Sequence, residues 1–402
     1  TNDKSKFLPV TPEILKGCHY KGGFDTVSIY LQNNPDSHFF ASKGLILGGS
    51  HSPSPLNRNA HCGDLSAVLL QNLNPLVNLI RVPDKKIILM DEWESKIKAI
   101  VESTWKTDVN SLSGVPSWML VLIKAVLQKT GSEYLTDVWP NMEVFFHGGI
   151  SFEPYRDQYK ALIPSDRMHY METYNASEGF FGLQDNPEEH SLLLMIDYSV
   201  FYEFIPINEV GEEHPTVLPL EAVEVGKNYA MVITTSGGLW RYQIGDTVRF
   251  TSLYPHKFVI SGRTKNFINA FGEELMVDNA DKAISRVCRQ TGAKVKEYTA
   301  APLFMLDKAK GRHQWMIEFE KMPPSLDDFA SLLDKTLQQL NSDYEAKRYK
   351  EISLQPLEIR VAREGTFYEW LRRKGKLGGQ HKIPRLSNDR TFIEELGKIC
   401  DS

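Results

Sequence analysis

Short apolar runs alternate with longer amphipathic stretches through the first 260 or so residues of the chain. The runs at 86–90, 143–146 and 230–234 are typical of buried strands. Between them, residues 93–105 and 117–128 carry apolar side chains three and four positions apart, which predicts helices lying on a sheet. The alternation predicts a large layered α/β domain over residues 1–261.

The pattern changes at residues 262–272, a stretch with a glycine at each end. We predict a hinge at 262–273. The elements predicted beyond it are, in order, a helix at about 279–291, strands at about 296–305 and 314–320, a helix at about 325–347, a strand at about 355–362 and a helical tail. Ser325 suits the N-cap of the longer helix. This order predicts a smaller α+β domain over 274–402, acting as a lid.

Composition and charge narrow the class of protein without identifying a partner. The chain has 402 residues, 42% hydrophobic content, a formal net charge of -5 and a pI near 6.1, which indicates a soluble globular protein of two domains. Neither nucleic acid nor a membrane surface is predicted as a partner, and no apolar run is long enough to span a bilayer. Four scattered cysteines, with no Cys-x-x-Cys pair, favour a reducing cytoplasm. The oligomeric state does not follow from the sequence.

The most informative motif is Tyr-Asn-Ala-Ser-Glu-Gly-Phe-Phe-Gly at residues 174–182. An aromatic ring, a hydroxyl and a carboxylate on one tight turn can flank an adenine, bond to a phosphate oxygen and hold Mg²⁺. Those groups are Tyr174, Ser177 and Glu178. A polar loop with a buried tyrosine is the simpler interpretation, and the motif alone does not decide between them.

Two further stretches end strands in glycine. In residues 237–248, Asp246 follows Gly245, and a carboxylate there can accept hydrogen bonds from both hydroxyls of a ribose. A surface aspartate in a turn is the alternative. Gly148 and Gly149 end the run at 145–150, where the lack of side chains permits a planar base to approach the backbone.

Lysines and apolar residues elsewhere provide weaker signals. The tail at 372–385 has six Lys or Arg residues and no acidic one, so a flexible loop there could bring one lysine to an α-phosphate. A solvated basic loop is the alternative. Lys4 and Lys6 would suit the trailing edge of a phosphate-binding loop, or could be surface lysines. Trp118, Met119, Leu120 and Leu122 could line an acyl pocket, although such residues are more often plain core.

These stretches, in this order, resemble the plant auxin-responsive Gretchen Hagen family of acyl acid-amido synthetases and their bacterial relatives. The wider superfamily contains acyl-CoA synthetases, peptide synthetases and luciferases. Residues 174–178 and 181–183 are similar to the family's Tyr-x-x-Ser-Glu motif and its Tyr-Phe-Gly sequel. Residues 202–206 resemble its Phe-Glu-Phe-Leu-Pro strand, and 238–246 resemble its Gly-Leu-Tyr-Arg-Tyr-Arg-x-Gly-Asp. The likeness extends over essentially the whole chain.

The resemblance implies a role for each candidate residue. Tyr174, Gly148 and Gly149 would meet the adenine, Asp246 the ribose, Ser177 the phosphate and Glu178 the Mg²⁺, with Arg263 as a further nucleotide contact. Lys382, in Gln-His-Lys-Ile-Pro-Arg, would be the adenylation lysine on the rotating lid. The 1–261 region would then be a nucleotide- and acyl-binding adenylation domain.

Two departures from the family pattern affect this expectation. Of the family's Ser-Ser-Gly-Thr-Thr phosphate loop only the last residue is present, as Thr1, so we expect the natural chain to extend upstream. Gln243 stands where the family usually has Arg. Both features leave open the activity of the chain as given and its affinity for a nucleotide.

The expected activity has two half-reactions, with ATP and Mg²⁺ as the only cofactors. A carboxylic acid would attack the α-phosphorus of MgATP to form acyl-AMP, and an amino acid amine would then take the acyl group. One alternative is an acyl-CoA ligase, in which a thiol is the acceptor. The other is a nucleotide-binding module without catalysis.

Overall fold

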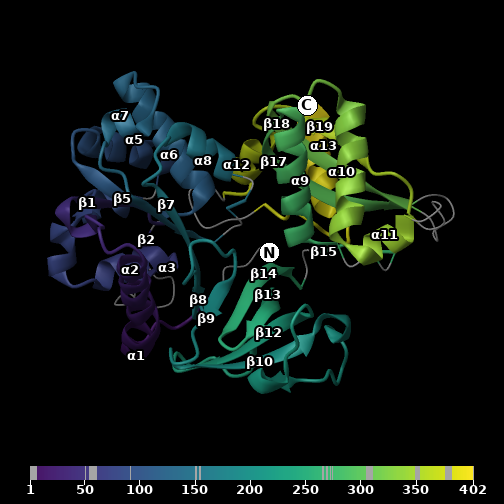
Figure 1. The fold of residues 1–402 in the computed structure, drawn as a ribbon, viewed down its shortest axis with the longest axis horizontal. Helices are drawn as coiled ribbons and strands as arrows, with labels where there is room; N and C mark the ends of the chain where they lie inside the picture. Colours follow the sequence, from purple (N-terminus) through teal and green to yellow (C-terminus); the bar gives the residue numbers. More distant parts are fainter. Residues whose placement is uncertain are drawn as a thin grey trace.

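The computed structural model describes residues 7–49, 51–53, 61–90, 92–149, 152–153, 155–264, 267–268, 270–271, 273, 275–304, 311–348, 354–375 and 383–401. Lys4, Lys6 and Lys382 lie outside the described residues. The described chain forms a large lobe (7–264) and a small lobe (267–401), seen to the left and below, and to the upper right, in Figure 1.

One mixed sheet runs through the large lobe, in the order β11-β10-β12-β13-β14-β9-β8-β7-β6-β5-β1-β4. The segment β4-β1-β5-β6-β7 is parallel, and the pairings from β7 to β11 are antiparallel. The strands are β1 (Lys43–Ile46), β4 (Arg81–Val82), β5 (Val109–Gly114), β6 (Val144–Gly148), β7 (His169–Ala176), β8 (Gly179–Leu183), β9 (Leu192–Leu194), β10 (Val200–Pro206), β11 (Leu218–Pro219), β12 (Asn228–Thr235), β13 (Tyr242–Leu253) and β14 (His256–Arg263). A separate ribbon pairs β2 (His51–Pro53) with β3 (His61–Gly63).

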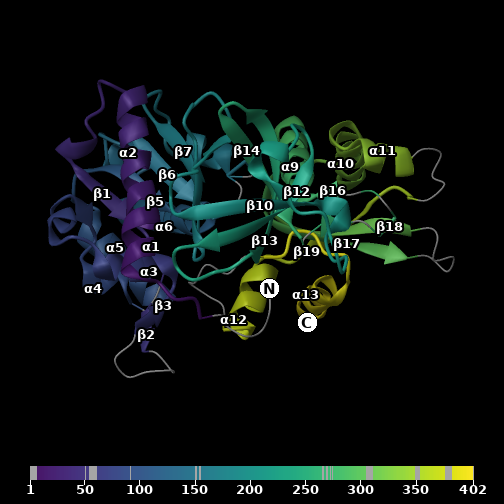
Figure 2. The ribbon, with the colours of Figure 1, turned by 90° about the horizontal axis from the view of Figure 1, so that it is seen from below.

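Helices cover the large-lobe sheet, and their ends follow local capping rules. Pro116 opens α6 at its first turn, and Gly131 ends it with a φ of 71°. Figure 2 shows α2 running across one face of the lobe. The helices are α1 (Pro12–Ile14), a π-helical turn (Leu15–Tyr20), α2 (Lys21–Asn33), α3 (Leu65–Asn72), α4 (Lys85–Ile88), α5 (Trp93–Thr104), α6 (Pro116–Thr130), α7 (Leu135–Val138) and α8 (Arg156–Leu162), with 3₁₀ turns at Phe39–Ala41, Pro75–Leu79, Ile207–Glu209 and Leu220–Ala222.

The prediction of a strand at 86–90 is wrong, because this segment contains most of the short helix α4. Asp84 caps the helix by accepting a hydrogen bond from the backbone N–H of Lys86 at 2.9 Å. Ile88 points into the core from that single turn. An apolar run this short fits a helical turn as well as a strand, and the preceding cap decides the outcome.

The small lobe contains the sheet β17-β18-β19, with β17 and β18 antiparallel and β18 and β19 parallel. Its elements are β15 (Phe267–Ile268), β16 (Leu275–Met276), α9 (Val277–Thr291), β17 (Lys294–Phe304), β18 (Gly311–Lys321), α10 (Leu326–Leu340), α11 (Ser342–Arg348), β19 (Glu358–Ala362), α12 (Thr366–Arg373) and α13 (Thr391–Asp401). Ser325 caps α10 as predicted, accepting from Asp328 N at 3.2 Å. The helix predicted to continue to 347 instead breaks at Asn341, whose side chain accepts from Tyr344 N.

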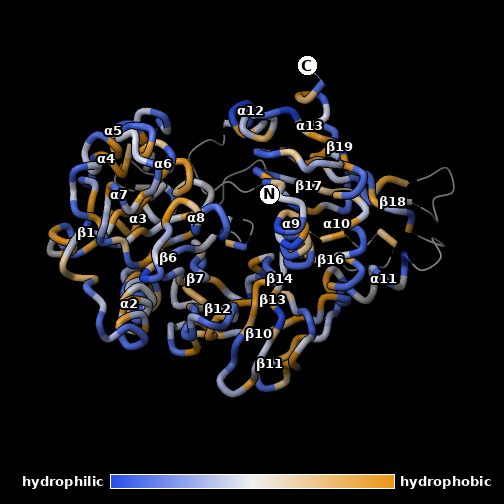
Figure 3. The backbone as a smooth tube through the Cα atoms, turned by 45° about the horizontal axis from the view of Figure 1, so that its top comes forward, coloured by the Kyte–Doolittle hydropathy of each residue, from blue (hydrophilic) through white to orange (hydrophobic). Residues whose placement is uncertain are grey.

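Each lobe has its own hydrophobic core. Residues of the large lobe form two large clusters, and those of the small lobe form two others. Figure 3 shows hydrophobic and hydrophilic stretches alternating along the chain of both lobes. Among the described residues, none of the helices combines the length and apolar character that crossing a membrane would require. The predicted fold class, a large layered α/β domain with a smaller α+β domain, is confirmed.

Candidate active site

Gly148 and the Ser177–Glu178 turn both lie at the carboxyl edge of the parallel strands. Gly148 ends β6, opposite Thr173 of β7, and the Ser177–Glu178 turn follows the end of β7. Ligands of open α/β sheets bind at this edge, where the strands deliver their last residues to one place. The topology therefore brings together motifs that lie about 30 residues apart in the sequence.

Gly148 and Gly149 are both required by the local backbone. A Cβ atom on Gly148 would lie 2.3 Å from the carbonyl oxygen of Thr173, which no side chain tolerates. Gly149 has a φ of 85°, in the left-handed region that favours glycine. The adenine contact of these glycines stays a prediction.

The turn between β7 and β8 consists of Ser177 and Glu178, closed by the pairing of Ala176 with Gly179. Ser177 is exposed and Glu178 is partly exposed. The π-helical turn at Leu15–Tyr20 contacts this hairpin through two side chains. His19 Nδ1 lies 3.1 Å from Asn175 Oδ1, and Cys18 Sγ accepts from Phe180 N at 3.0 Å. Single π-helical turns often occur beside functional sites, and nothing in the sequence pattern pointed to this one.

Asp246 lies between two partners that the sequence placed far from it. The Tyr174 hydroxyl donates to Asp246 Oδ2 at 2.5 Å, and Arg263 Nε contacts Asp246 Oδ1 at 3.1 Å. Asp246 and Arg263 are paired across β13 and β14, just after Gly245, whose φ is 86°. Burial and the carboxylate of Asp246 hold the pKa of Tyr174 well above its usual value, so Tyr174 keeps its proton and donates.

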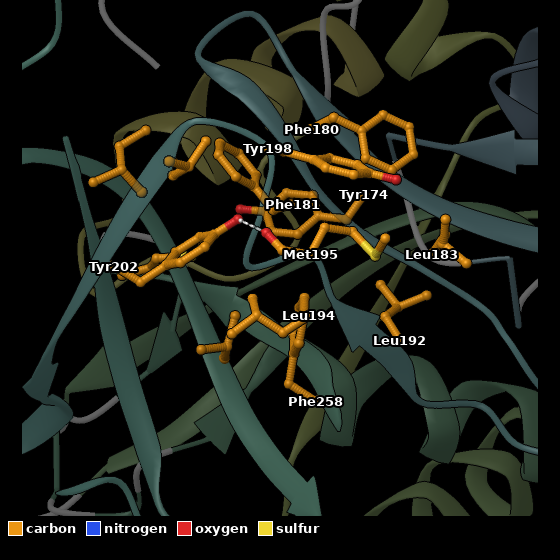
Figure 4. Close-up of a cluster of buried hydrophobic side chains, with 14 of the residues drawn as sticks. Tyr174, Phe180, Phe181, Leu183, Leu192, Leu194, Met195, Tyr198, Tyr202 and Phe258 are labelled. Carbon is orange, nitrogen blue, oxygen red and sulfur yellow. Dashed lines mark hydrogen bonds between the residues drawn. The ribbon is translucent and has the colours of Figure 1, made fainter. Parts of the chain in front are cut away.

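The ring of Tyr174 lies in the core and not at the edge of the site. The residue is 6% exposed, and its ring packs edge-on against Phe181 and Phe258, with centroids 5.0 and 6.1 Å away (Figure 4). We expected this ring to flank an adenine. In this structure its faces are covered by the core, and it is the hydroxyl that reaches the site.

A cavity of about 400 Å³ lies between the lobes, beside Gly149. Trp118 of α6 lines it, together with Phe367 of α12 and other residues of the small lobe. Met119 does not line it, because successive helical residues face different directions, and Met119 is fully buried in the core. Of the four residues predicted for an acyl pocket, Trp118 and Leu120 border this space.

Several residues near the site carried no signal in the sequence. Glu172 of β7 lies opposite His147, and burial raises the pKa of its carboxyl to about 7. Tyr155 and Arg385 line the cavity from opposite lobes. Glu172 and Tyr155 are common residue types with no motif around them. Arg385 is the last residue of the basic tail at 372–385, but nothing in the sequence indicated a role for it.

The fold is similar to that of adenylate-forming enzymes. A structure of 2-hydroxyisobutyryl-CoA ligase in the postadenylation state matches with a TM-score of 0.55 and 12% identity, covering 94% of this chain and 73% of that one. Models of the GH3 family N-terminal, central and C-terminal domains match residues 1–168, 193–263 and 278–391. The chain belongs to the GH3 family, and the family resemblance seen in the motifs is confirmed.

Named relatives have amido synthetase or ligase activities. Indole-3-acetic acid-amido synthetase GH3.4 of Arabidopsis thaliana is 30% identical over 335 residues, covering 75% of this chain and 53% of the relative. The 4-substituted benzoates-glutamate ligase GH3.12 of the same plant is 27% identical, covering 77% and 59%. The structure of GH3.15 acyl acid amido synthetase matches with a TM-score of 0.75 and 18% identity, covering 99% of this chain and 81% of that one. The chain spans about half the length of the curated relatives it matches.

Proposed function

We propose that the protein activates a carboxylic acid as acyl-AMP with ATP and transfers the acyl group to the amine of an amino acid. The observation that carries the proposal is Asp246, held between Tyr174 and Arg263 at the edge where the Ser177–Glu178 turn also lies. A carboxylate fixed on two sides is suited to accept from the hydroxyls of a ribose. The family membership supports the same activity.

Each candidate residue has a role in this proposal. Asp246 accepts hydrogen bonds from the ribose hydroxyls, Gly148 and Gly149 contact the adenine, and Ser177 donates to a phosphate oxygen. Tyr174 acts through its hydroxyl on Asp246. Arg263, Lys4 and Lys6 are further contacts of the nucleotide, and Lys382 is the lysine of the adenylation step. Trp118 borders the space for the acyl group or the acceptor.

Mg²⁺ would enter with ATP and not as a resident metal. In the described part of the chain, no group of three His, Cys, Asp or Glu residues could hold a metal ion. Mg²⁺ in nucleotide sites is commonly held by one or two carboxylates and the phosphates themselves. Glu178, partly exposed on the hairpin turn, can supply such a carboxylate.

The proposed reaction has two half-reactions at one site. In the first half-reaction, a carboxylate oxygen of the acid attacks the α-phosphorus, the bond to pyrophosphate breaks and acyl-AMP forms. In the second, the amine nitrogen attacks the acyl carbonyl, AMP leaves with the bonding electron pair, and the nitrogen loses a proton. Movement of the small lobe about the predicted hinge at 262–273 separates the two steps.

The substrates are small molecules, with no nucleic acid and no membrane as partner. The proposed location is the cytoplasm, where Cys18, Cys288 and Cys400 would stay reduced as the free thiols seen in the structure.

The test uses the full-length protein and a panel of carboxylic acids. We expect acid-dependent exchange of labelled pyrophosphate into ATP, and AMP release that requires an amino acid. Asp246→Asn should reduce the exchange at least tenfold, whereas Asp197→Asn, which removes a surface partner of Lys21, should leave it unchanged. Release of AMP that requires coenzyme A instead would identify a thiol ligase. Binding of ATP with no exchange for any acid would reject the proposal.

A further inference from the structure

The segment at 384–387 is fastened along the edge strand β17 of the small lobe. Thr299 Oγ1 donates to the carbonyl of Pro384 at 2.7 Å, and Ala300 N donates to that of Arg385 at 2.8 Å. Ser387 N in turn donates to the carbonyl of Ala300 at 3.1 Å. These bonds fix the backbone of Arg385 to the small lobe.

The side chain of Arg385 is held by the same lobe. Its guanidinium lies 3.1 Å from Glu297 Oε1 and 3.4 Å from Asp281 Oδ1, and it stacks over the ring of Tyr298 at 4.5 Å. The side chain is only 12% exposed. Burial opposes the charge, but the carboxylates of Glu297 and Asp281 raise the pKa of Arg385 well above its usual value. Arg385 is therefore a fixed cation, paired within its own lobe.

One further bond of this guanidinium crosses to the large lobe. Arg385 Nη2 donates to the hydroxyl of Tyr155 at 3.3 Å. Tyr155 is 5% exposed, directly precedes α8 and lines the same cavity as Gly149. The crossing bond thus joins the small lobe to the wall of the candidate site, in a buried place where water competes poorly for either group.

We propose that Arg385 is a positioning residue for the first half-reaction, acting through Tyr155. The bonds to Glu297, Asp281 and Tyr298 move with the small lobe as one body, whereas the bond to Tyr155 exists only in this arrangement of the lobes. It stabilises the arrangement in which both lobes line the cavity beside Gly149, and it breaks when the small lobe moves for acyl transfer. This inference rests on the proposed two-step function.

The test removes one oxygen atom by Tyr155→Phe in the full-length protein. Arg385 itself is a poor choice, since its loss would remove the cation beside Glu297 and Asp281 and could unfold the lobe. Two rates are measured separately: acid-dependent pyrophosphate exchange, and transfer from purified acyl-AMP to the amine. A hydrogen bond from a charged donor changes a population about tenfold, so kcat for exchange should fall about tenfold with the KM for ATP unchanged. The rate of transfer should be unchanged or higher.

Tyr159→Phe is the matched control. The Tyr159 hydroxyl donates to the carbonyl of Pro116 at 2.7 Å, entirely within the large lobe, one turn further along α8. Both variants lose one buried hydroxyl, but only Tyr155→Phe should change the ratio of the two rates. An unchanged ratio in Tyr155→Phe, whether both rates stay the same or both fall, overturns the inference. If the wild-type protein shows no acid-dependent exchange, the proposed function itself fails.

Discussion

At the scale of single residues, the candidate site depends on how one carboxylate is held. Each oxygen of Asp246 already has one partner: Oδ2 accepts a hydrogen bond from the Tyr174 hydroxyl, and Oδ1 forms an ion pair with Arg263. A carboxylate oxygen has a second lone-pair direction, so both remain able to accept from a ribose hydroxyl. Because the Tyr174 ring is packed in the core, its hydroxyl can hold Asp246 in one orientation before any nucleotide binds.

We therefore expect Tyr174→Phe to weaken ATP binding about tenfold, since a hydrogen bond to a charged acceptor contributes about 1.5–3 kcal/mol. Isothermal titration with ATP measures the dissociation constant, and thermal unfolding reports the stability. Tyr198→Phe is the control, because the Tyr198 hydroxyl lies in the same cluster but donates to Asp25 Oδ2 at 2.6 Å and not to Asp246. Both variants should lose stability, but only Tyr174→Phe should bind ATP more weakly. Equal affinity of Tyr174→Phe and the wild type would contradict this role.

At the scale of secondary-structure elements, the hairpin β7–β8 depends on the close approach of α2. A Cβ atom on Gly22 would lie 2.5 Å from the ring of Phe180, whereas one on Gly23 would have no neighbour within 4 Å. Gly22 is buried and Gly23 is exposed, although they are adjacent in the same helix. The position of the Ser177–Glu178 turn thus rests partly on a glycine in another element.

This pair of glycines gives a prediction with a built-in control. Gly22→Ala should lower the free energy of unfolding by about 1–3 kcal/mol, because the added methyl group overpacks the contact with Phe180. Gly23→Ala should raise it by about 0.5–1 kcal/mol, because alanine is the better helix former. Urea denaturation measures both. If the free energy of unfolding changed with the same sign in both variants, the contact between Gly22 and Phe180 would not limit the size of the residue at position 22.

Most elements could be predicted from the sequence where the periodicity was long or a cap was present. The helices α5, α6 and α9 and the strands β17 and β18 lie within a few residues of their predicted ranges. The short run at 86–90 was misassigned, since one turn of helix and a short strand have the same apolar content. Asn341 ended α10 early through a side-chain cap that the helical periodicity around it concealed.

The site was less predictable, because its geometry depends on pairings between distant strands. Glycines and the Ser177–Glu178 turn could be read from local composition. The approach of Tyr174 to Asp246 could not, since it spans 72 positions and depends on the sheet order. Burial of the Tyr174 ring could not be predicted either, because it depends on packing against Phe258, which is distant in the sequence. The cavity beside Trp118 requires the placement of both lobes, which no local pattern contains.

At the scale of the whole molecule, polar contacts and not a shared core join the two lobes. Among the described residues, no hydrophobic cluster contains side chains from both lobes. Glu153 of the large lobe contacts Ser285 and Arg289 of α9 at 3.3 and 3.4 Å, and Lys124 contacts Glu320 at 3.2 Å. Partly exposed pairs of this kind contribute little each. The lobes can therefore change their arrangement without exposing a core.

The buried carboxyl group of Glu172 makes the stability of the protein depend on pH. Burial raises the pKa of Glu172 to about 7, with Asp278 of the small lobe and Glu153 adding to the effect and Arg156 opposing it. His147, paired with Glu172 across β6 and β7, is neutral, since burial lowers its pKa to about 3. Glu172 is thus largely protonated in the folded protein at pH values where the unfolded chain has already ionised.

The sign of the resulting pH dependence follows from linkage. Below the usual glutamate pKa of 4.5, Glu172 is protonated in both states and contributes no slope. Between 4.5 and about 7 only the unfolded chain ionises, so the folded state loses relative stability as pH rises, and above 7 the loss is complete. Glu172→Gln removes this loss. Its unfolding free energy should equal that of the wild type at pH 4 and exceed it at pH 8 by on the order of 2 kcal/mol.

Thermal unfolding of both proteins from pH 4 to pH 8 measures this difference, and all other groups cancel in the comparison. Glu189→Gln is a control of opposite sign, because hydrogen bonds from Lys257 and other partners lower the pKa of Glu189. That variant should be the less stable protein above pH 4.5, by a small amount since Glu189 is exposed. A constant difference between Glu172→Gln and the wild type over the whole range would mean that Glu172 ionises normally.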